Sequence, residues 1–458
     1  MTFRVPVELD LIDVLDAPDR DYGAYFLDTL LRKRVTWDVD ARGYSRLQRS
    51  IVTRFIPERR FTGIRGALEA QQVIHVDRSY RAGERSIGYR LEPWYWPSRS
   101  IECRNKALIR RIQERQAVRE KRLLPVHRWL HSKFGILDFD HGLAAEIIST
   151  MLPEDGSLIT VHDYRVLLRE ICHRFRRRGA PFFEVDAFGR VHTPITNLPA
   201  ELRPCLSVNG QKLVGLDLTS SQPLICGILA QRFAESPVLR SRMLNRRFDG
   251  RTEPYVWREV AATRRKGGVG GSHLRAASHR ALASPNMCCA RHENPVKTGT
   301  FSNRQVKSSA PADDLDRYLR LCEEGRLYEH LMEPGEDRSR LKVRLFADVF
   351  FGKPCYRSRL KQRFEREFPT IAGMLQSLKQ RDYRQVAWLM QSYESTLFIA
   401  IICRRLMNEK PQLPIFTIHD SILTVPDGVE DVRHVILEEF AKLGIVPTLK
   451  EECYASGP

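Results

Sequence analysis

Residues 213–230, LVGLDLTSSQPLICGILA, give the strongest local signal in this chain. The apolar run at 213–216 predicts a buried strand, and the polar residues after Asp217 predict a turn that leads into an apolar helix. The strand therefore ends on a carboxylate. Taken alone, an aspartate at such a place is more often a turn or capping residue than a catalytic one.

A second stretch, LPIFTIHDSILTVP at 413–426, predicts a hairpin that carries His419 and Asp420 between two apolar strands. Two aspartates brought together would repel by about 1 to 4 kcal/mol at ~4 Å, depending on the local dielectric. Divalent cations remove that conflict. A pair of Mg²⁺ ions, with Mn²⁺ as an alternative, held by Asp217 and Asp420 is the arrangement that supports nucleotidyl transfer. The alternative is two unrelated turn aspartates.

Between these stretches, DRSRLKVRLFADVFFGK at 337–353 places Arg338, Lys342, Phe346 and Phe350 four residues apart. This spacing puts them on one side of a helix. A functional interpretation puts the two cations on a triphosphate and one aromatic ring against a base or sugar. The alternative is a structural helix that buries its aromatic residues and leaves its cations in solvent.

The composition limits the partners. The chain has 458 residues, enough for two or three domains, and 74 Lys and Arg against 56 Asp and Glu leave a net charge of +18. This surplus favours nucleic acid or acidic membrane surfaces as partners. The hydrophobic content of 42% is that of an ordinary soluble protein and excludes collagen-like and wholly disordered chains. With no long apolar run and no signal peptide, we expect a cytoplasmic protein without a membrane partner. The ten cysteines show no C-x-x-C pair, which predicts reduced thiols.

The N-terminal residues 1–100 predict a separate helical module. Helices are expected at 22–34, at 44–57 and near 64–71, followed by strands at 73–76 and 86–91. Three helices and a hairpin are the order of a winged helix, although a small α+β cap without a ligand has the same pattern. Residues 104–122 then predict a helix with eight Lys and Arg against two Glu, either a solvated face or a phosphate contact.

Two further basic segments follow. A helix at about 161–177 ends in a cluster of arginines, Arg174, Arg176, Arg177 and Arg178. Residues 261–310 lack periodicity and predict a flexible basic insertion. Its His273, His279, Cys288, Cys289 and His292 match no standard zinc spacing, so a zinc site is not favoured.

Four blocks in order resemble the family A DNA polymerases and the related phage single-subunit RNA polymerases. They are FGRVHTPITNLPAELR at 188–203, the strand with Asp217, the helix with Arg338 to Phe350, and LMQSYESTLFIAIICRRL followed by IHDSI. The resemblance implies that Asp217 and Asp420 bind the metals and that Arg338 and Lys342 hold the phosphates. It further implies that Lys342 protonates pyrophosphate, that Phe346 packs against the incoming nucleotide, and that Arg190, Gln391 and His419 contact primer-template.

Three departures leave the choice of sugar open. Gln222 stands where the DNA polymerases of the family carry a glutamate that blocks a ribose 2′-hydroxyl, and Phe350 replaces a tyrosine that helps to select the sugar. Ser421 follows Asp420, as in the phage RNA polymerases. A DNA polymerase is therefore the leading hypothesis. RNA polymerase or primase activity, or an inactive polymerase that only binds nucleic acid, are the alternatives, and a membrane-surface protein is weaker.

The expected architecture is an α+β right hand, with an antiparallel palm sheet and helical fingers. After the N-terminal module come a basic, thumb-like linker at 101–185, the first part of the palm at 186–260, the insertion at 261–311, fingers at 312–410, and the second part of the palm at 411–458. No exonuclease domain is recognisable. Because the fingers are short, a processivity or replication partner is expected. Replication of a mobile element, repair and defence stay open as the setting.

Overall fold

The computed structural model describes residues 1–35, 39, 42–80, 86–92, 98–153, 159–176, 182–246 and 313–454. Within these ranges the chain is a mixed α+β protein with small antiparallel sheets. The basic insertion predicted at 261–311, with its histidines and cysteines, lies outside the described residues, as do Arg177 and Arg178. Of the arginines beside them, Arg174 is half-buried, and burial lowers its pKa to about 10.

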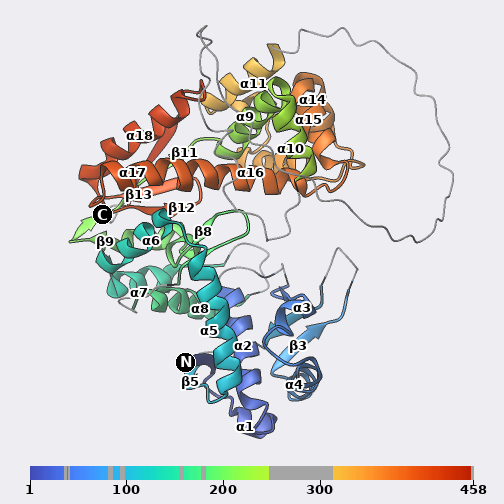
Figure 1. Cartoon of the computed structure of the whole chain (residues 1–458), viewed down its shortest axis with the longest axis vertical. Helices are drawn as coiled ribbons and strands as arrows, with labels where there is room; N and C mark the ends of the chain where they lie inside the picture. The colour runs from blue at the N-terminus through green and yellow to red at the C-terminus, as the bar shows by residue number, and fades with distance from the viewer. Residues whose placement is uncertain are drawn as a thin grey trace, which may run out of the picture.

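A four-stranded antiparallel sheet forms the centre of the C-terminal half (Figure 1). Its order is β12 (Phe416–Ile418), β13 (Ser421–Thr424), β11 (Val214–Leu218) and β14 (Leu449–Cys453). The two predicted aspartate-bearing segments are therefore neighbours in one sheet. The sequence predicted that Asp217 lies at the end of its strand. Strand β11 instead continues to Leu218, so Asp217 lies within the strand.

The two faces of this sheet have different neighbours. Val214, Leu216 and Leu218 alternate along β11 and join one hydrophobic core with helices α9 (Ser221–Glu235) and α18 (Val429–Ala441). On the other face, Leu423 joins a second core with helices α7 (His141–Thr150) and α8 (Val161–Cys172). Asp217 points to this second face, away from α18, because successive side chains on a strand alternate.

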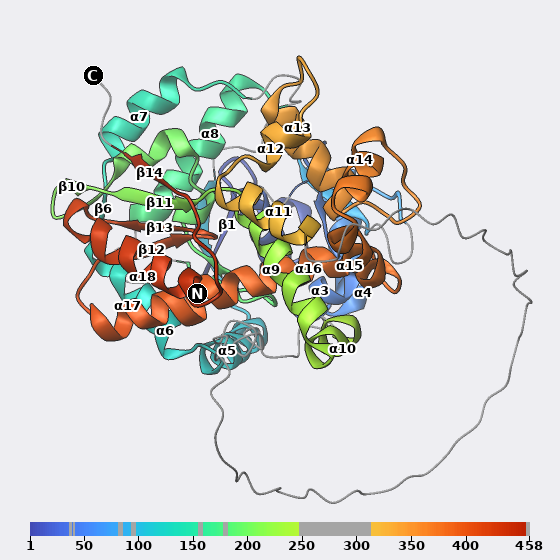
Figure 2. The same cartoon turned by 90° about the horizontal axis from the view of Figure 1, so that it is seen from above.

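Helices make up the described region from 313 to 409, beside the sheet (Figure 2). They are α11 (Asp313–Glu323), α12 (Leu327–Leu331), α13 (Arg338–Arg344), the π-helix η6 (Leu345–Phe350), α14 (Arg359–Glu367), α15 (Pro369–Lys379), α16 (Gln385–Ser395), the π-helix η7 (Thr396–Cys403) and α17 (Arg404–Glu409). Helix α11 packs tightly on α9 at Gly227, where a Cβ would lie 2.5 Å from a Leu319 methyl group. Any larger residue at this position would require the side chain of Leu319 to shift.

The N-terminal module has its own hydrophobic core. Its order is β1 (Thr2–Pro6), α1 (Leu11–Val14), α2 (Arg20–Val35), β2 (Ser45–Arg46), α3 (Arg49–Val52), α4 (Glu58–Ala70), β3 (Ile74–Asp77), β4 (Gly88–Leu91) and β5 (Ser98–Glu102). Strands β2, β4 and β3 form a sheet in that order, and β1 pairs with β5. The predictions of the first helix and of both hairpin strands are confirmed.

The predicted helix at 44–57 is wrong in this module. Ser45 and Arg46 instead pair with β4, and the amide of Leu47 donates to the carbonyl of Ile87, which leaves only the four-residue α3 before the next helix. Pro57 precedes α4 as its N-cap. The apolar spacing of Leu47, Ile51 and Phe55 matched a helix, but tertiary pairing with β4 overrode it.

A helical segment joins the N-terminal module to the sheet. It contains α5 (Lys106–Lys121), which confirms the predicted basic helix, then α6 (Pro125–Ser132), the 3₁₀-turn η1 (Lys133–Ile136), β6 (Leu137–Phe139), α7, α8 and the 3₁₀-turn η2 (His173–Arg176). The hairpin β7 (Glu184–Val185) and β8 (Val191–His192) follows, with two 3₁₀-turns, η3 (Ile195–Asn197) and η4 (Ala200–Cys205), and strands β9 (Leu206–Val208) and β10 (Gln211–Lys212). Helix α10 (Pro237–Asn245) and the turn η8 (Pro426–Gly428) complete the elements.

Two further sequence expectations concern the membrane and the thiols. By length and composition, the continuous helical stretch Gln385–Glu409 is apolar enough to cross a membrane, but 78% of its apolar window is buried inside the fold, as in a core helix. All eight cysteines in the described ranges are free thiols, six of them buried.

Candidate active site

The register of the sheet brings Asp217 and Asp420 together. Asp217 on β11 lies directly opposite Ser421 on β13, the residue that follows Asp420 in the hairpin turn. Directly opposed residues in an antiparallel pair have Cβ atoms about 5 Å apart. Asp217 and Asp420 are therefore neighbours, and the charge of Asp420 acts on Asp217.

Both carboxyl groups are held in a setting that disfavours their charged forms. Burial raises the pKa of Asp217 to about 7, and the carboxylates of Asp420 and Glu452 add to this rise. Burial also raises the pKa of Asp420. Lys342 acts on both groups in the opposite direction. A cation placed between the two aspartates would therefore offset the burial of their charges and the repulsion between them.

The two aspartates fit a magnesium site in which the protein supplies only some of the ligands. No cluster of three or more His, Cys, Asp or Glu side chains in the described ranges is arranged to hold a metal. Mg²⁺ commonly binds through one or two carboxylates and takes its remaining ligands from water and substrate phosphates. Asp217 and Asp420 match that pattern, and they would hold the ion only with help from a substrate.

Helix α13 brings Lys342 near the two aspartates. Lys342 is exposed, yet it is close enough to lower the pKa of both Asp217 and Asp420. Arg338 lies one turn earlier, with its guanidinium over the ring of Tyr328 at 4.9 Å and its Nε 2.6 Å from Glu329. The two predicted phosphate-binding cations therefore stand on one helix beside the carboxylate pair.

The two aromatic residues of the predicted stripe are not equivalent. The helix changes from α to π at Leu345, which breaks the four-residue phase. Phe346 is half-buried, whereas Phe350 has no exposed surface and packs against Phe364 in the core. The expectation that Phe350 faces a substrate is therefore not met in this conformation.

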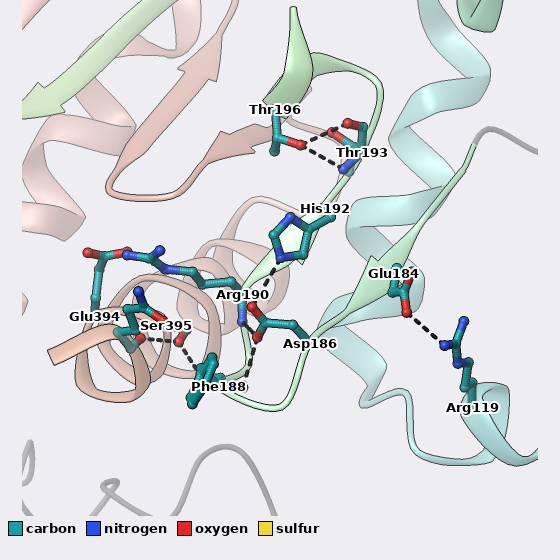
Figure 3. Close-up of polar contacts among 11 residues, drawn as sticks. Arg119, Glu184, Asp186, Phe188, Arg190, His192, Thr193, Thr196, Glu394 and Ser395 are labelled. Carbon is teal, nitrogen blue, oxygen red and sulfur yellow. Dashed lines mark hydrogen bonds and ion pairs between the residues drawn. The ribbon is translucent and has the colours of Figure 1, made fainter. Parts of the chain in front are cut away.

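Glu394 on α16 is a buried acid that the sequence analysis missed. It is 1% exposed, and its Oε1 accepts hydrogen bonds from Nε and Nη2 of Arg190 at 3.0 and 2.7 Å (Figure 3). Gln222 also bonds to this carboxyl, and the charge of Asp420 acts on it. Burial raises the pKa of Glu394 to about 7. The side chains of Arg190 and Gln222 are therefore joined through one acid beside the aspartate pair.

A short loop between β7 and β8 positions Arg190 and His192. The carboxylate of Asp186 accepts from the amides of Phe188 and Arg190 and contacts Nε2 of His192 at 3.1 Å (Figure 3). The hydroxyl of Ser395, which follows Glu394 at the end of α16, donates to the carbonyl of Phe188. This loop is therefore fixed to α16 at two points.

His419 lies beneath the same loop in an unusual backbone conformation. Its φ is 52°, in the left-handed region that non-glycine residues rarely adopt, and its ring centroid is 6.1 Å from that of His192. Burial, with the charges of Arg190 and His192, lowers its pKa to about 4. Its Nδ1 is buried and has no partner among the described residues. Gln391 is half-buried one turn before Ser395 and accepts a bond from that serine through its backbone carbonyl.

The comparisons with known proteins add little to this geometry. No known protein family matches the chain, and no curated protein matches it at a significant level. Among solved structures, it is similar to the POL domain of Pol1 from M. smegmatis in complex with DNA primer-template and dNTP. The identity is 11%, the match covers 76% of this chain and 73% of that chain, and the TM-score is 0.35. A TM-score of this size does not establish a shared fold, so function has to be inferred from the site.

Proposed function

We propose that this chain is a template-directed nucleotidyltransferase, and specifically a compact DNA polymerase. The observation that carries the proposal is the pair Asp217 and Asp420 on adjacent antiparallel strands, with Lys342 close to both. Two half-buried acids and a nearby cation on a separate helix are suited to a substrate that brings both metal and phosphate. The net charge of +18 agrees with a polyanionic template.

Each site residue has a distinct role in the proposed reaction. When bound at Asp217 and Asp420, Mg²⁺ or Mn²⁺ would supply activation of a 3′-hydroxyl and stabilisation of the leaving pyrophosphate. Arg338 and Lys342 bind the triphosphate, and the Lys342 ammonium donates a proton to the departing pyrophosphate. Phe346, half-buried on the same helix, packs against the nucleotide. Gln391 and His419 contact the primer-template, and Arg190 does so while it is oriented by Glu394.

The proposal also assigns the parts of a right hand. The four-stranded sheet corresponds to the palm, and the helices from α11 to α17 correspond to the fingers. The N-terminal module corresponds to a winged helix. Its order of α2, β2, α3, α4, β3 and β4, with the sheet order β2, β4 and β3, supports that assignment.

A second candidate substrate, the ribonucleotide, is favoured by the position of Gln222. Gln222 carries no charge that could repel a ribose 2′-hydroxyl, and its side chain is hydrogen-bonded to Glu394. Extension of the same primer with either dNTPs or rNTPs, and with no primer at all, separates DNA polymerase, RNA polymerase and primase activities. A chain that strongly prefers rNTPs would move the assignment to the RNA polymerase.

Primer extension on a defined template with Mg²⁺ tests the proposal. We expect Asp217→Asn and Asp420→Asn each to lower the rate by about 10³-fold or more, since each removes half of the metal site. Glu430→Gln is the matched control, because Glu430 is 83% exposed on α18 and should leave the rate unchanged. Wild-type activity in either aspartate variant would remove the proposed chemistry. A wild-type chain that binds DNA but never extends it would be a nucleic-acid-binding protein.

A further inference from the structure

Helix α5 presents a row of arginines that the proposed active site does not use. Arg111, Arg115, Arg119 and Arg122 recur at spacings of four and three residues, so they follow one side of the helix. Every residue from 113 to 122 is exposed. This end of α5 has no apolar face that packs against the rest of the fold, so its surface is available to a partner.

The row continues onto the N-terminal module. Nη1 of Arg111 donates to the carbonyl of Phe55 at 3.2 Å, which places the neighbouring Arg54 beside α5. Partial desolvation lowers the pKa of Arg115, and the charges of Arg119, Arg54 and Arg122 lower it further. Arg115 therefore lies among the like charges of Arg54, Arg119 and Arg122. These four residues, here called the α5 cluster, span α5 and the N-terminal module against which it packs.

Few acids balance this charge. Within the part of the chain that the structure describes, Glu184 is the one carboxylate that pairs with any member of the α5 cluster, at 3.0 Å from Arg119 (Figure 3). Four guanidinium groups and one carboxylate leave three positive charges. A polyanion would offset the repulsion, and displacement of its counterions would favour binding.

We propose that the α5 cluster binds the phosphate backbone of a double-stranded nucleic acid. Helix α5 has no aromatic residue, and within the described ranges Tyr25 and Phe55 beside it pack against the core of the N-terminal module. Single-strand surfaces rely on exposed aromatic rings that stack on bases. A surface with guanidinium groups but no such rings fits backbone contacts along a duplex, which carries phosphates in regular rows.

The α5 cluster is connected to the candidate active site. Glu184 is the first residue of β7, and the loop between β7 and β8 carries Arg190 (Figure 3). The Arg119–Glu184 ion pair therefore links α5 to the hairpin whose loop is fixed to α16. The inference goes beyond the proposed chemistry, because binding of a duplex requires neither metal nor nucleotide.

Fluorescence anisotropy with a labelled duplex, and with one strand of it, tests the proposal in the absence of metal and nucleotide. The variant is Arg54→Gln, Arg115→Gln and Arg122→Gln, which leaves the Arg119 pair with Glu184 intact. We expect the slope of log affinity against log salt to fall by about 2 to 3, since each lost phosphate contact removes about 0.9. The duplex dissociation constant should rise by roughly tenfold or more near 0.1 M salt.

Two further variants keep the test specific. Arg→Lys at the same three positions retains the charges and should keep the wild-type salt slope. Arg404→Gln, Lys410→Gln and Lys442→Gln remove three charges from α17 and the end of α18, and should leave duplex binding unchanged. An unchanged slope in the α5 variant, an equal loss in this control, or tighter wild-type binding to the single strand would overturn the proposal. Failure of primer extension would not, so the two proposals fail separately.

Discussion

The guanidinium of Arg190 lies 2.7 Å from the carboxylate of Glu394, a residue 204 positions later in the chain. The pair ties the loop between β7 and β8 to helix α16, next to the candidate metal-binding aspartates. Arg190 is 14% exposed and Glu394 1%, so both charges are largely out of water. Removal of one partner leaves the other buried and unpaired, which costs far more than the pair itself contributes.

Glu394→Ala should therefore destabilise the protein by about 3 to 5 kcal/mol, the usual cost of an uncompensated buried charge. Urea denaturation followed by circular dichroism measures this change in the free energy of unfolding. The double variant Arg190→Gln with Glu394→Gln, which removes both charges, should be more stable than Glu394→Ala. A cost below about 1 kcal/mol for Glu394→Ala would mean that the ion pair is exposed to solvent.

The raised pKa of Asp217 predicts how stability depends on pH without metal. Its pKa is about 7 in the folded chain and near 3.8 in the unfolded chain, so between these values the folded protein binds the extra proton. The stability from this group is complete below about pH 4 and is lost as the pH rises through 7. Asp217→Asn should make the decrease between pH 4 and 7 shallower by at most ~1.4 kcal/mol per pH unit. Unfolding free energies measured across this range with a chelator check the sign. A steeper decrease in the variant would contradict it.

Lys342→Ala should lower the rate of nucleotide addition by about 10² to 10⁴-fold, because it removes both a phosphate ligand and the proton donor. Single-turnover kinetics separate this loss of rate from weaker nucleotide binding. Arg340→Ala is the matched control, since Arg340 is an exposed cation on the same helix that lies off the Arg338 and Lys342 row. Equal losses in both variants would show that α13 contributes only general positive charge.

Phe350→Ala should destabilise the fold by about 3 to 5 kcal/mol, as expected for a fully buried phenylalanine in a packed core. Phe346→Ala should cost less stability because Phe346 is half-buried, but it should weaken nucleotide binding more. Thermal unfolding and the Michaelis constant for nucleotide together measure the two effects. If Phe350→Ala folded normally and bound nucleotide weakly, Phe350 would contact the nucleotide and not serve only as a core residue.

The sequence predicted the elements whose signal is local. The apolar run before Asp217 and the hairpin around Asp420 were both recovered as β11, β12 and β13, and the basic helix was recovered as α5. Strand β14 was missed because its sequence, LKEEC, lacks apolar alternation and is held by pairing with β11. Glu394 was missed because its partner is distant in sequence. The single charged residue in the otherwise uncharged stretch from Leu389 to Cys403 was the one signal that could have identified it.

The π-helices explain a subtler difference. A four-residue spacing cannot distinguish a continuous α-helix from one that becomes a π-helix at Leu345. The spacing therefore placed Phe350 on the wrong side of the helix, whereas Lys342, which precedes the change, lies near the aspartates. The relation between β2 and β4 likewise depends on residues more than forty positions apart. Such long-range pairings set the register of the module, and no local pattern encodes them.

Single-nucleotide incorporation by Asp217→Asn, Asp420→Asn and the double variant, compared with wild type at saturating Mg²⁺, measures whether the two aspartates form one metal site. If the two aspartates act as one metal site, each single variant should lose nearly all activity, and the double variant should be little worse than either, because residues that act as a unit are strongly non-additive. Near wild-type incorporation by either single variant, or losses that multiply in the double variant, would contradict a shared site.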